Sequence, residues 1–228
     1  MRSLPEHTVD CWVSAAVLAE YPEALLWAPT QHGPDNWDIA FEETGSGKAF
    51  ILENKGTECT DGQHTIEINM EQLDIYLRSP GASVYYVLPV PPWPARESVS
   101  VLSAAYPVPA AAQCRLGTGH RHGPFTDWCR VIEAWGLYDW LKDYGSKTRT
   151  FRAPDIIACP LAVKLGEFLE GVRTCTHGGP RYESAADAHD GWAAQLRQRQ
   201  DQLAAIPVEP NPVERRVRSG VLGVFVPV

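Results

Sequence analysis

The stretch PDNWDIAFEETGSGKAFILENKGT, residues 34–57, says most about the fold of this chain. Two short apolar runs, at about 37–43 and 48–55, flank the pair Gly45-Ser46. A Gly-Ser pair between two strand-like runs favours a two-residue turn that joins antiparallel strands. The sequence therefore predicts a β-hairpin whose second strand closes on Glu-Asn-Lys.

The register of this hairpin brings charged side chains together. If Thr44 pairs with Gly47, then Asp38 lies directly opposite Glu53. Because side chains alternate between the two faces of a strand, Glu53 and Lys55 share a face, and the register adds Asp38 to it. The opposite face is apolar and is expected in the core, with Trp37, Ile39, Phe41, Phe50 and Leu52.

Two carboxylates and one lysine at a strand end form a reaction site for a phosphodiester. Asp38 and Glu53 offer oxygen ligands, which Mg²⁺ and Mn²⁺ prefer. The metal activates water and offsets the charge that develops on phosphate. Lys55 can orient that water or stabilise the pentavalent phosphorus. The plain alternative for the same pattern is an ordinary hairpin with a solvated charged face.

Composition sets limits on the class of protein. The chain has 228 residues and a hydrophobic content of 44%, which supports a packed core. No apolar run approaches the roughly 18 residues of a membrane span, and residues 1–10 do not resemble a signal peptide, so a cytoplasmic protein is expected. Six cysteines without a CxxC pair are expected to be reduced thiols.

The formal charge of -8 argues against a surface that is coated with phosphate-binding groups. A nuclease remains possible because metal ions supply local positive charge. Any groove for nucleic acid is then expected to be local, with Arg78, Lys142, Lys147, Arg149 and Arg152 as its basic residues.

The elements around the hairpin predict a mixed α/β layer fold. Apolar periodicity predicts a first helix over 3–20, and a run typical of a strand follows at 24–30. After the hairpin, the sequence predicts a helix over 67–79 and a strand over 83–90. Further helices are expected over 125–144, 160–171 and 184–204.

The end of the chain combines a Pro-rich linker, 207–212, with the apolar run VRSGVLGVFVPV, 217–228. This run is expected to form a final strand, at a sheet edge or in a subunit contact, because an apolar run of this length is costly to leave in water. The expected organisation is a core over 1–90, a helical and loop continuation over 91–206, and a linker with an apolar tail over 207–228.

The order of elements over roughly residues 1–90 resembles the PD-(D/E)xK nuclease superfamily. The residues that carry the resemblance are Asp38, the string Glu53-Asn54-Lys55, and the pair Gln72 and Tyr76. This pair resembles the QxxxY motif of the RecB-like branch, and residues four apart share a helix face. The resemblance implies a restriction-endonuclease-like mixed sheet flanked by helices, with a helical C-terminal portion.

The resemblance also implies roles for these residues. Asp38 and Glu53 would bind one or two Mg²⁺ ions (or Mn²⁺), and the peptide carbonyl of Asn54 is the preferred further ligand over the carbonyl that precedes Glu53. Lys55 would position water for in-line attack. Gln72 and Tyr76 would support the site or contact the nucleic acid, although packing against the sheet explains this pair almost equally well.

Two assignments stay open. Members of the branch often carry an acidic residue on the first helix that faces the metal, and Glu6 fits that place. The spacing of Ser3 and Glu6 also fits a capping box, which explains Glu6 equally well. Asp35 in the dipeptide Pro34-Asp35 competes with Asp38, which is preferred because it leads directly into a strand.

The expected function is that of a metal-dependent nuclease that hydrolyses phosphodiester bonds, with DNA as the expected substrate. The main alternative is a catalytically silent nuclease-like domain that acts as a binding or assembly subunit, and a third is a plain α/β interaction module. The expected partners are nucleic acid, a protein partner or a second copy of the chain. Binding to a membrane is not expected. The sequence does not distinguish DNA from RNA, or endonuclease from exonuclease.

Overall fold

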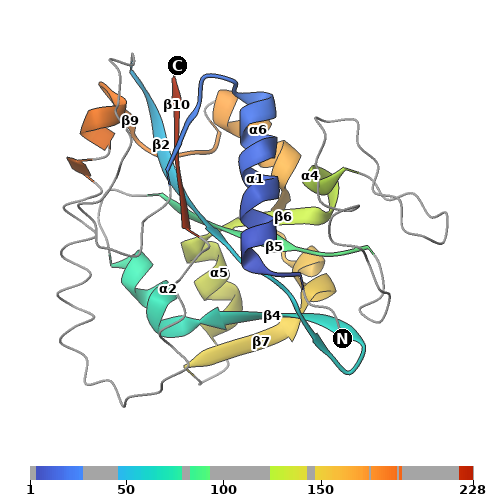
Figure 1. The fold of residues 1–228 in the computed structure, drawn as a ribbon. Coiled ribbons are helices and arrows are strands. Elements are labelled where there is room, and N and C mark those ends of the chain that lie inside the picture. The colour runs from blue at the N-terminus through green and yellow to red at the C-terminus, as the bar shows by residue number, and fades with distance from the viewer. Residues whose placement is uncertain are drawn as a thin grey trace.

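The computed structural model describes residues 4–27, 46–78, 83–92, 124–142, 147–174, 176–188, 190–191 and 221–227. Within these ranges the chain is an α/β fold in which a mixed sheet of parallel and antiparallel strands is flanked by helices (Figure 1). Its elements, in chain order, are α1 (Glu6–Glu20), β1 (Leu25–Trp27), β2 (Gly47–Asn54), β3 (Glu58–Thr60), β4 (Gln63–Asn69), α2 (Met70–Leu77), β5 (Val84–Pro89), α4 (Phe125–Trp128), β6 (Cys129–Glu133), α5 (Ala134–Leu141), β7 (Thr148–Arg152), the 3₁₀ helix η2 (Ala153–Ala158), β8 (Val163–Lys164), α6 (Leu165–Arg173), β9 (Arg181–Tyr182) and β10 (Val221–Pro227).

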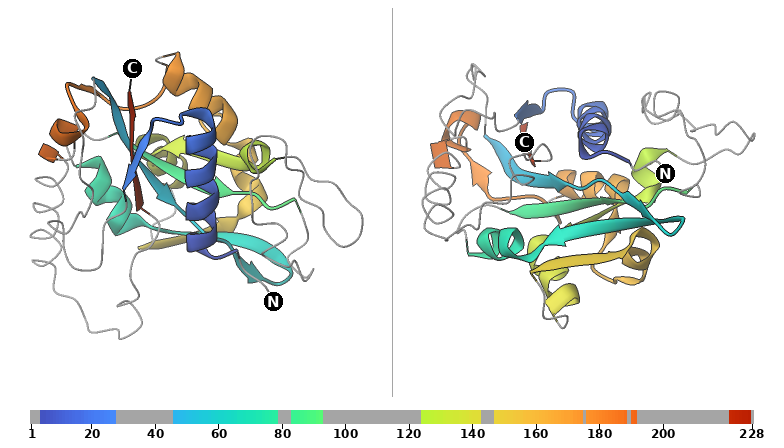
Figure 2. Two further views of the ribbon diagram at one scale, coloured as in Figure 1. Left: turned by 45° about the horizontal axis from the view of Figure 1, so that its top comes forward. Right: turned by 60° about the horizontal axis from the view of Figure 1, so that its bottom comes forward.

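The large sheet has the strand order β1-β10-β2-β5-β6-β8, and β9 pairs with the beginning of β2. Strand β2 lies inside this sheet, antiparallel to β10 and parallel to β5. A smaller sheet, β3-β4-β7, packs below it on the side of α2 and α5, whereas α1 lies on the opposite side (Figure 2). The site described below forms where β2 ends between these two layers.

Strand β2 is buried on both faces, as expected for an interior strand covered by helices on each side. Phe50 and Leu52 pack into the core formed with α1 and α6, as the sequence predicted for this face. Ala49 and Ile51 pack into a second core with α2, α5 and β4. The alternation of the strand therefore sends Glu53 towards α2 and Asn54 towards α1.

The hairpin register predicted from Gly45-Ser46 is wrong at Glu53. The two Cα partners of Glu53 are Val221 of β10 and Tyr86 of β5, so both sides of this residue are taken by other strands. Seven residue pairs join β2 to β10, and the apolar C-terminal run supplies this ladder. Asp38 and the expected first hairpin strand, 37–43, lie outside the described residues.

Some of the other predicted elements are confirmed, and others differ in the structure. The strands at 48–55 and 83–90 are confirmed as β2 and β5, and α1 confirms the first helix with Val9, Val13, Ala16 and Val17 buried. The second helix begins only at Met70, because residues 63–65 pair with β3 and residues 65–69 pair with β7. Of the helix expected over 184–204, residues 185–188 and 190–191 are helical, Ser184 is not, and the others lie outside the described residues.

The helix predicted over 125–144 is wrong in its middle. Residues 129–133 form β6, which pairs with β5 on one side and with β8 on the other. Val131 and Ile132 are buried there, so sheet pairing outweighs a helical pattern read from the sequence. The helix expected over 160–171 lies at Leu165–Arg173 instead. The described residues between 124 and 191 therefore alternate strands with helices, and the helical C-terminal portion is not observed there.

The apolar run at the C-terminus is confirmed as a strand, but its place differs from the expected sheet edge. Strand β10 lies between β1 and β2, inside the large sheet (Figure 1). Leu222, Val224, Phe225 and Val226 are buried. The end of the chain therefore belongs to the sheet that carries Glu53. None of the described helices is long and apolar enough to cross a membrane.

The interior place of β10 leads to a prediction about stability. Replacement Phe225→Ala removes a ring that is 0% exposed and is expected to lower the free energy of unfolding by about 3–5 kcal/mol, measured by urea denaturation. The control Ile157→Ala, at a side chain 55% exposed, should change it by less than about 0.5 kcal/mol. A similar, small effect of both substitutions would contradict the burial of β10.

Candidate active site

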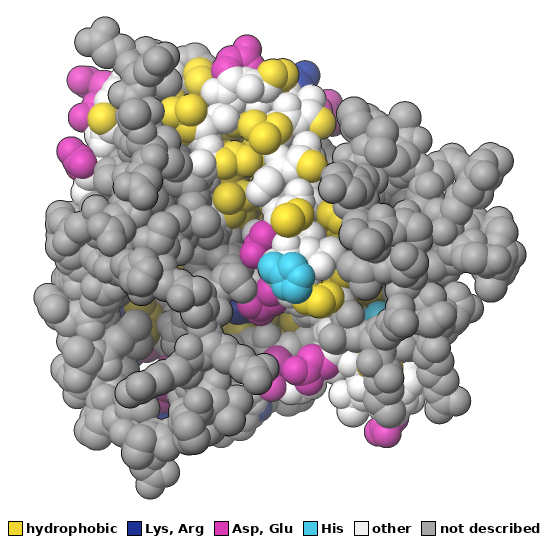
Figure 3. All heavy atoms as spheres, viewed as in Figure 1, with side chains coloured by type: hydrophobic (Ala, Val, Ile, Leu, Met, Phe, Trp, Pro, Cys, Tyr) yellow, Lys and Arg dark blue, Asp and Glu magenta, His cyan; other side chains and the backbone are white. Residues whose placement is uncertain are grey.

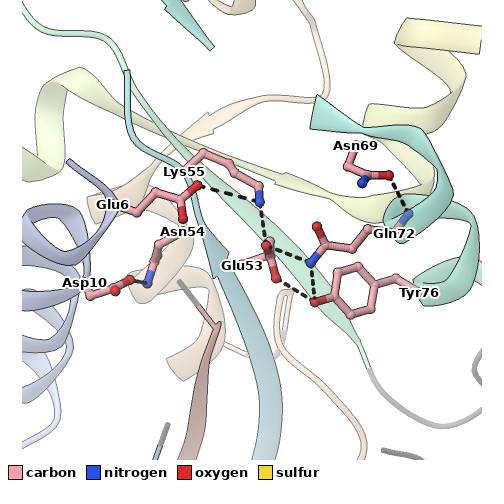
Figure 4. Close-up of polar contacts among 8 residues, drawn as sticks. All are labelled: Glu6, Asp10, Glu53, Asn54, Lys55, Asn69, Gln72 and Tyr76. Atoms are coloured by element: carbon pink, nitrogen blue, oxygen red, sulfur yellow. Dashed lines mark hydrogen bonds and ion pairs between the residues drawn. The ribbon is translucent and has the colours of Figure 1, made fainter. Parts of the chain in front are cut away.

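The site is built around the carboxylate of Glu53, near the end of β2. Glu53 is 2% exposed and Lys55 is 9% exposed. The Nζ of Lys55 donates a hydrogen bond to Oε1 of Glu53 at 2.6 Å (Figure 4). The prediction that these two residues share a face is therefore confirmed.

Helix α2 supplies two more donors to the same carboxylate. The Nε2 of Gln72 donates to Oε1 of Glu53 at 3.0 Å, and the hydroxyl of Tyr76 donates to Oε2 at 2.6 Å. The Nε2 of Gln72 also lies 3.0 Å from the hydroxyl of Tyr76 (Figure 4). The four-residue spacing thus places both side chains on the helix face that covers Glu53.

Local sequence explains why α2 starts where it does. Asn69 ends β4 and acts as the N-cap, because its side chain accepts a hydrogen bond from the backbone N–H of Gln72 at 3.0 Å. Leu73, on the buried side of the helix, is 0% exposed and anchors the helix in the core shared with β2. The cap and this anchor together aim Gln72 and Tyr76 at Glu53.

Helix α1 approaches the end of β2 from the other side. Leu4 and Thr57 exchange two backbone hydrogen bonds, of 2.9 and 2.8 Å, which tie the start of α1 to the segment after β2. Gly56 lies in this crossing, where an added Cβ would come 2.4 Å from the carbonyl oxygen of Leu4. Only glycine allows this approach, which brings Glu6 next to Lys55.

Glu6 lies beside Lys55. Its Oε1 lies 3.8 Å from Nζ of Lys55, and its carboxylate accepts a hydrogen bond from the backbone of Gly56. The capping-box explanation for Glu6 is wrong, because the N-cap of α1 is Pro5, which makes no side-chain cap hydrogen bond. Ser3 lies outside the described residues.

Asp10 is a site residue that the sequence analysis did not select. One turn after Glu6 on α1, its Oδ1 accepts a hydrogen bond from Nδ2 of Asn54 at 2.8 Å. Asn54 is 0% exposed, and its Oδ1 has no hydrogen-bond partner among the described residues. The four-residue spacing of Glu6 and Asp10 was the signal in the sequence, because such residues share a helix face.

The surroundings of the site disfavour the charged forms of two carboxylates, Glu6 and Asp10. Burial raises the pKa of Glu6, with Glu53 and Asp10 acting in the same direction and Lys55 opposing them. Burial also raises the pKa of Asp10, and the hydrogen bond from Asn54 opposes this rise. Acidic side chains gather near the first turn of α1 on the face drawn in Figure 3. One ammonium group therefore faces three carboxylates, a balance that favours an added cation.

The oxygen atoms at the site are of the kind that Mg²⁺ or Mn²⁺ takes as ligands. They are the carboxylate oxygens of Glu53, Glu6 and Asp10 and the amide and peptide oxygens of Asn54. A carboxylate has about four lone-pair positions, and Glu53 already accepts three hydrogen bonds. Within the described ranges, no group of three or more His, Cys, Asp or Glu residues is placed to hold a metal, and Asp38 lies outside those ranges.

The basic residues that were expected to form a groove have acidic neighbours. Ion pairs join Arg78 to Asp74, Lys142 to Asp139, Lys147 to Glu71, and Arg152 to Asp155. Exposed pairs of this kind contribute little stability, but they offset the charge of each cation. The expected basic groove is therefore weaker than its residues suggest.

The raised pKa of Asp10 leads to a prediction about pH. A carboxyl group with a raised pKa in the folded state destabilises that state once it is charged, so stability falls as pH rises through the raised pKa. Asp10→Asn keeps an oxygen acceptor for Asn54 and is expected to raise the melting temperature at pH 7.5 by up to about 4 °C, in EDTA. The gain should shrink as the pH falls through the raised pKa, because the wild-type group then takes up a proton.

Asp127→Asn, at an exposed carboxylate on α4, is the control and should change the melting temperature little at either pH. Asp10→Asn that melts lower than wild type at pH 7.5 would show instead that the charge of Asp10 stabilises the fold.

No protein-family model, curated protein or solved structure matches this chain. Function is therefore inferred from the geometry of the cluster formed by Glu53, Lys55, Gln72 and Tyr76, together with Glu6, Asp10 and Asn54 on its α1 side.

Proposed function

We propose that the chain is a metal-dependent nuclease of the restriction-endonuclease-like fold, which hydrolyses phosphodiester bonds in nucleic acid, with DNA as the first substrate to test. One observation carries the proposal: the Glu53 carboxylate accepts hydrogen bonds from Lys55, Gln72 and Tyr76 at 2.6–3.0 Å. These are the residues that match the ExK and QxxxY motifs. Two motifs from separate elements meet on one carboxylate, which a chance match does not require.

The proposed site gives each residue a distinct task. Glu53, Asp38 and the peptide carbonyl of Asn54 would hold Mg²⁺ or Mn²⁺, which supplies positive charge to phosphate and acidifies bound water. Lys55, held between the carboxylates of Glu53 and Glu6, would orient the attacking water or bind a phosphate oxygen.

Gln72 and Tyr76 would act as positioning residues in this proposal. Their hydrogen bonds fix both oxygens of Glu53, and hydrogen bonds to a charged group contribute more than neutral ones. On the other face of β2, Asp10 fixes the side chain of Asn54 and so holds the peptide whose carbonyl would face the metal. Preorganised groups of this kind lower a barrier because they need not reorganise during the reaction.

The second candidate function is a catalytically silent, nuclease-like subunit that binds or assembles with a partner. The observation that favours it is that both oxygens of Glu53 are already engaged by donors from the chain itself. The network can then serve to stabilise a buried charge, with no reaction at all. The overall charge of -8 agrees with a domain that does not bind nucleic acid broadly.

The decisive experiment is a cleavage assay with a panel of single- and double-stranded DNA and RNA, in Mg²⁺, Mn²⁺, Ca²⁺ or EDTA. Lys55→Met replaces the ammonium by an apolar end of similar length and is expected to lower the cleavage rate about 10²- to 10³-fold, as does loss of a group that stabilises developing charge. Glu53→Gln should lower it at least as much, because it also weakens metal binding.

Lys164→Met is the matched control, because Lys164, on β8, is a half-buried lysine in a surface ion pair with Glu167. It should cleave as the wild type does. Cleavage that continues undiminished in EDTA would exclude the metal mechanism, and undiminished cleavage by a folded Lys55→Met protein would exclude the catalytic role of Lys55. Absence of any cleavage by the wild type in Mg²⁺ and Mn²⁺ would favour the silent subunit.

A further inference from the structure

A cavity of about 480 Å³ follows β7, apart from the Glu53 cluster. Four consecutive residues of this strand, Arg149–Arg152, line it, together with Trp140 of α5 and Asp155 of η2. None of the residues that bond to Glu53 takes part in this lining. Its volume falls within the range of roughly 300–1,000 Å³ that is usual for sites of small molecules.

Two aromatic rings form the apolar part of the cavity. Trp140 and Phe151 lie with ring centroids 5.0 Å apart and planes at 88°, an edge-to-face pair. In such a pair one face of one ring meets an edge of the other, so the pair itself does not cover the remaining ring faces. Base rings stack on the faces of aromatic side chains, whatever the base.

The polar part of the cavity carries both charges. Arg149, Arg152 and Asp155 are among the lining residues, and because residues three apart on a strand lie on opposite faces, only the guanidinium of Arg152 is placed beside Asp155. The Nε and Nη2 of Arg152 donate to the two oxygens of Asp155 at 3.1 and 2.7 Å, which fixes the plane of this exposed guanidinium. A guanidinium has five N–H donors, so Arg152 keeps donors for an anion outside this fork.

We propose that this cavity binds a single nucleotide, either free or as a residue of a single strand. The base would stack on Trp140 or Phe151, and its phosphate would bind to Arg152, whose planar guanidinium suits phosphate oxygens. Asp155 would accept an N–H of the base edge, as acidic side chains do from cytosine N4.

This binding does not depend on cleavage, because the cavity shares no residue with the Glu53 cluster. The two are nevertheless linked through the start of β7. The backbone N–H of Met70, the first residue of α2, donates to the carbonyl of Lys147 at 2.8 Å. The strand that lines the cavity thus begins beside the helix that carries Gln72 and Tyr76.

Calorimetric titration of the whole chain in EDTA tests the proposal, with cytidine monophosphate, cytidine, inorganic phosphate and a short oligodeoxycytidylate as probes. The monophosphate should bind at least about tenfold more tightly than cytidine or phosphate alone, because each of these lacks one half of the contacts. Trp140→Leu should weaken its binding about tenfold through loss of stacking. Arg152→Gln should weaken it about fivefold or more through loss of a charged donor.

Arg78→Gln is the matched control, because Arg78 is also an exposed arginine paired with an aspartate nearby in sequence, outside the cavity. It should change binding less than about twofold, within the usual effect of a remote surface substitution. Lys55→Met should lower the cleavage rate and leave this binding unchanged, which separates failure of the cavity proposal from failure of the nuclease proposal. If Trp140→Leu melts lower than wild type, Arg152→Gln alone decides the outcome, because its side chain is exposed.

If the oligonucleotide binds, the monophosphate does not, and Arg152→Gln weakens the binding of the oligonucleotide, the result supports a strand as the source of the nucleotide. If the monophosphate binds and the oligonucleotide does not, the result supports a free nucleotide. The proposal is overturned if neither probe binds, if phosphate alone binds as tightly as the monophosphate, or if Arg152→Gln weakens binding no more than Arg78→Gln.

Discussion

Burial of the Glu53 carboxylate is the constraint on which the rest of this structure depends. An ionised carboxylate in an apolar interior is strongly unfavourable unless donors replace the lost water. Here an ammonium, an amide and a phenol do so, from Lys55 two residues along the chain and from Gln72 and Tyr76 on α2. The position of α2 is therefore set by a polar requirement as well as by the apolar contacts of Leu73.

The same residue explains the organisation on the other side of β2. Because strand residues alternate, a Glu53 that points to α2 requires an Asn54 that points to α1, where Asp10 receives its amide. Lys55 then reaches Glu53 and Glu6 together, since the crossing at Gly56 brings α1 close. The result concentrates negative charge around one cation, which folding stability alone does not favour. Groups held against their own repulsion are a common mark of functional sites.

Much of the candidate site could be predicted from sequence because its signals are local. The two-residue spacing of Glu53 and Lys55 and the four-residue spacing of Gln72 and Tyr76 each follow from the period of one element. The hairpin register failed because it assumed the nearest strand in sequence as the partner, whereas Val221 comes from the far end of the chain. Strand β6 was missed for a similar reason, because its pairing with β5 and β8 outweighs local helical periodicity.

The position of β10 helps to fix the backbone at Glu53. Glu53 lies between Val221 and Tyr86, so the backbone that carries the carboxylate is fixed by ladders on both sides. A residue fixed in this way loses little further freedom when it binds a ligand, which is the advantage of a preorganised site. A metal at Glu53 would share Oε1 with Lys55 and Gln72 or Oε2 with Tyr76, because three of the roughly four lone-pair positions already accept hydrogen bonds. Of these donors, Lys55 is the one whose positive charge a metal would replace, which frees its ammonium for water or phosphate while the neutral donors keep the carboxylate in place. A silent subunit has no need for this division between one charged donor and two neutral ones, because any three donors would satisfy the buried charge.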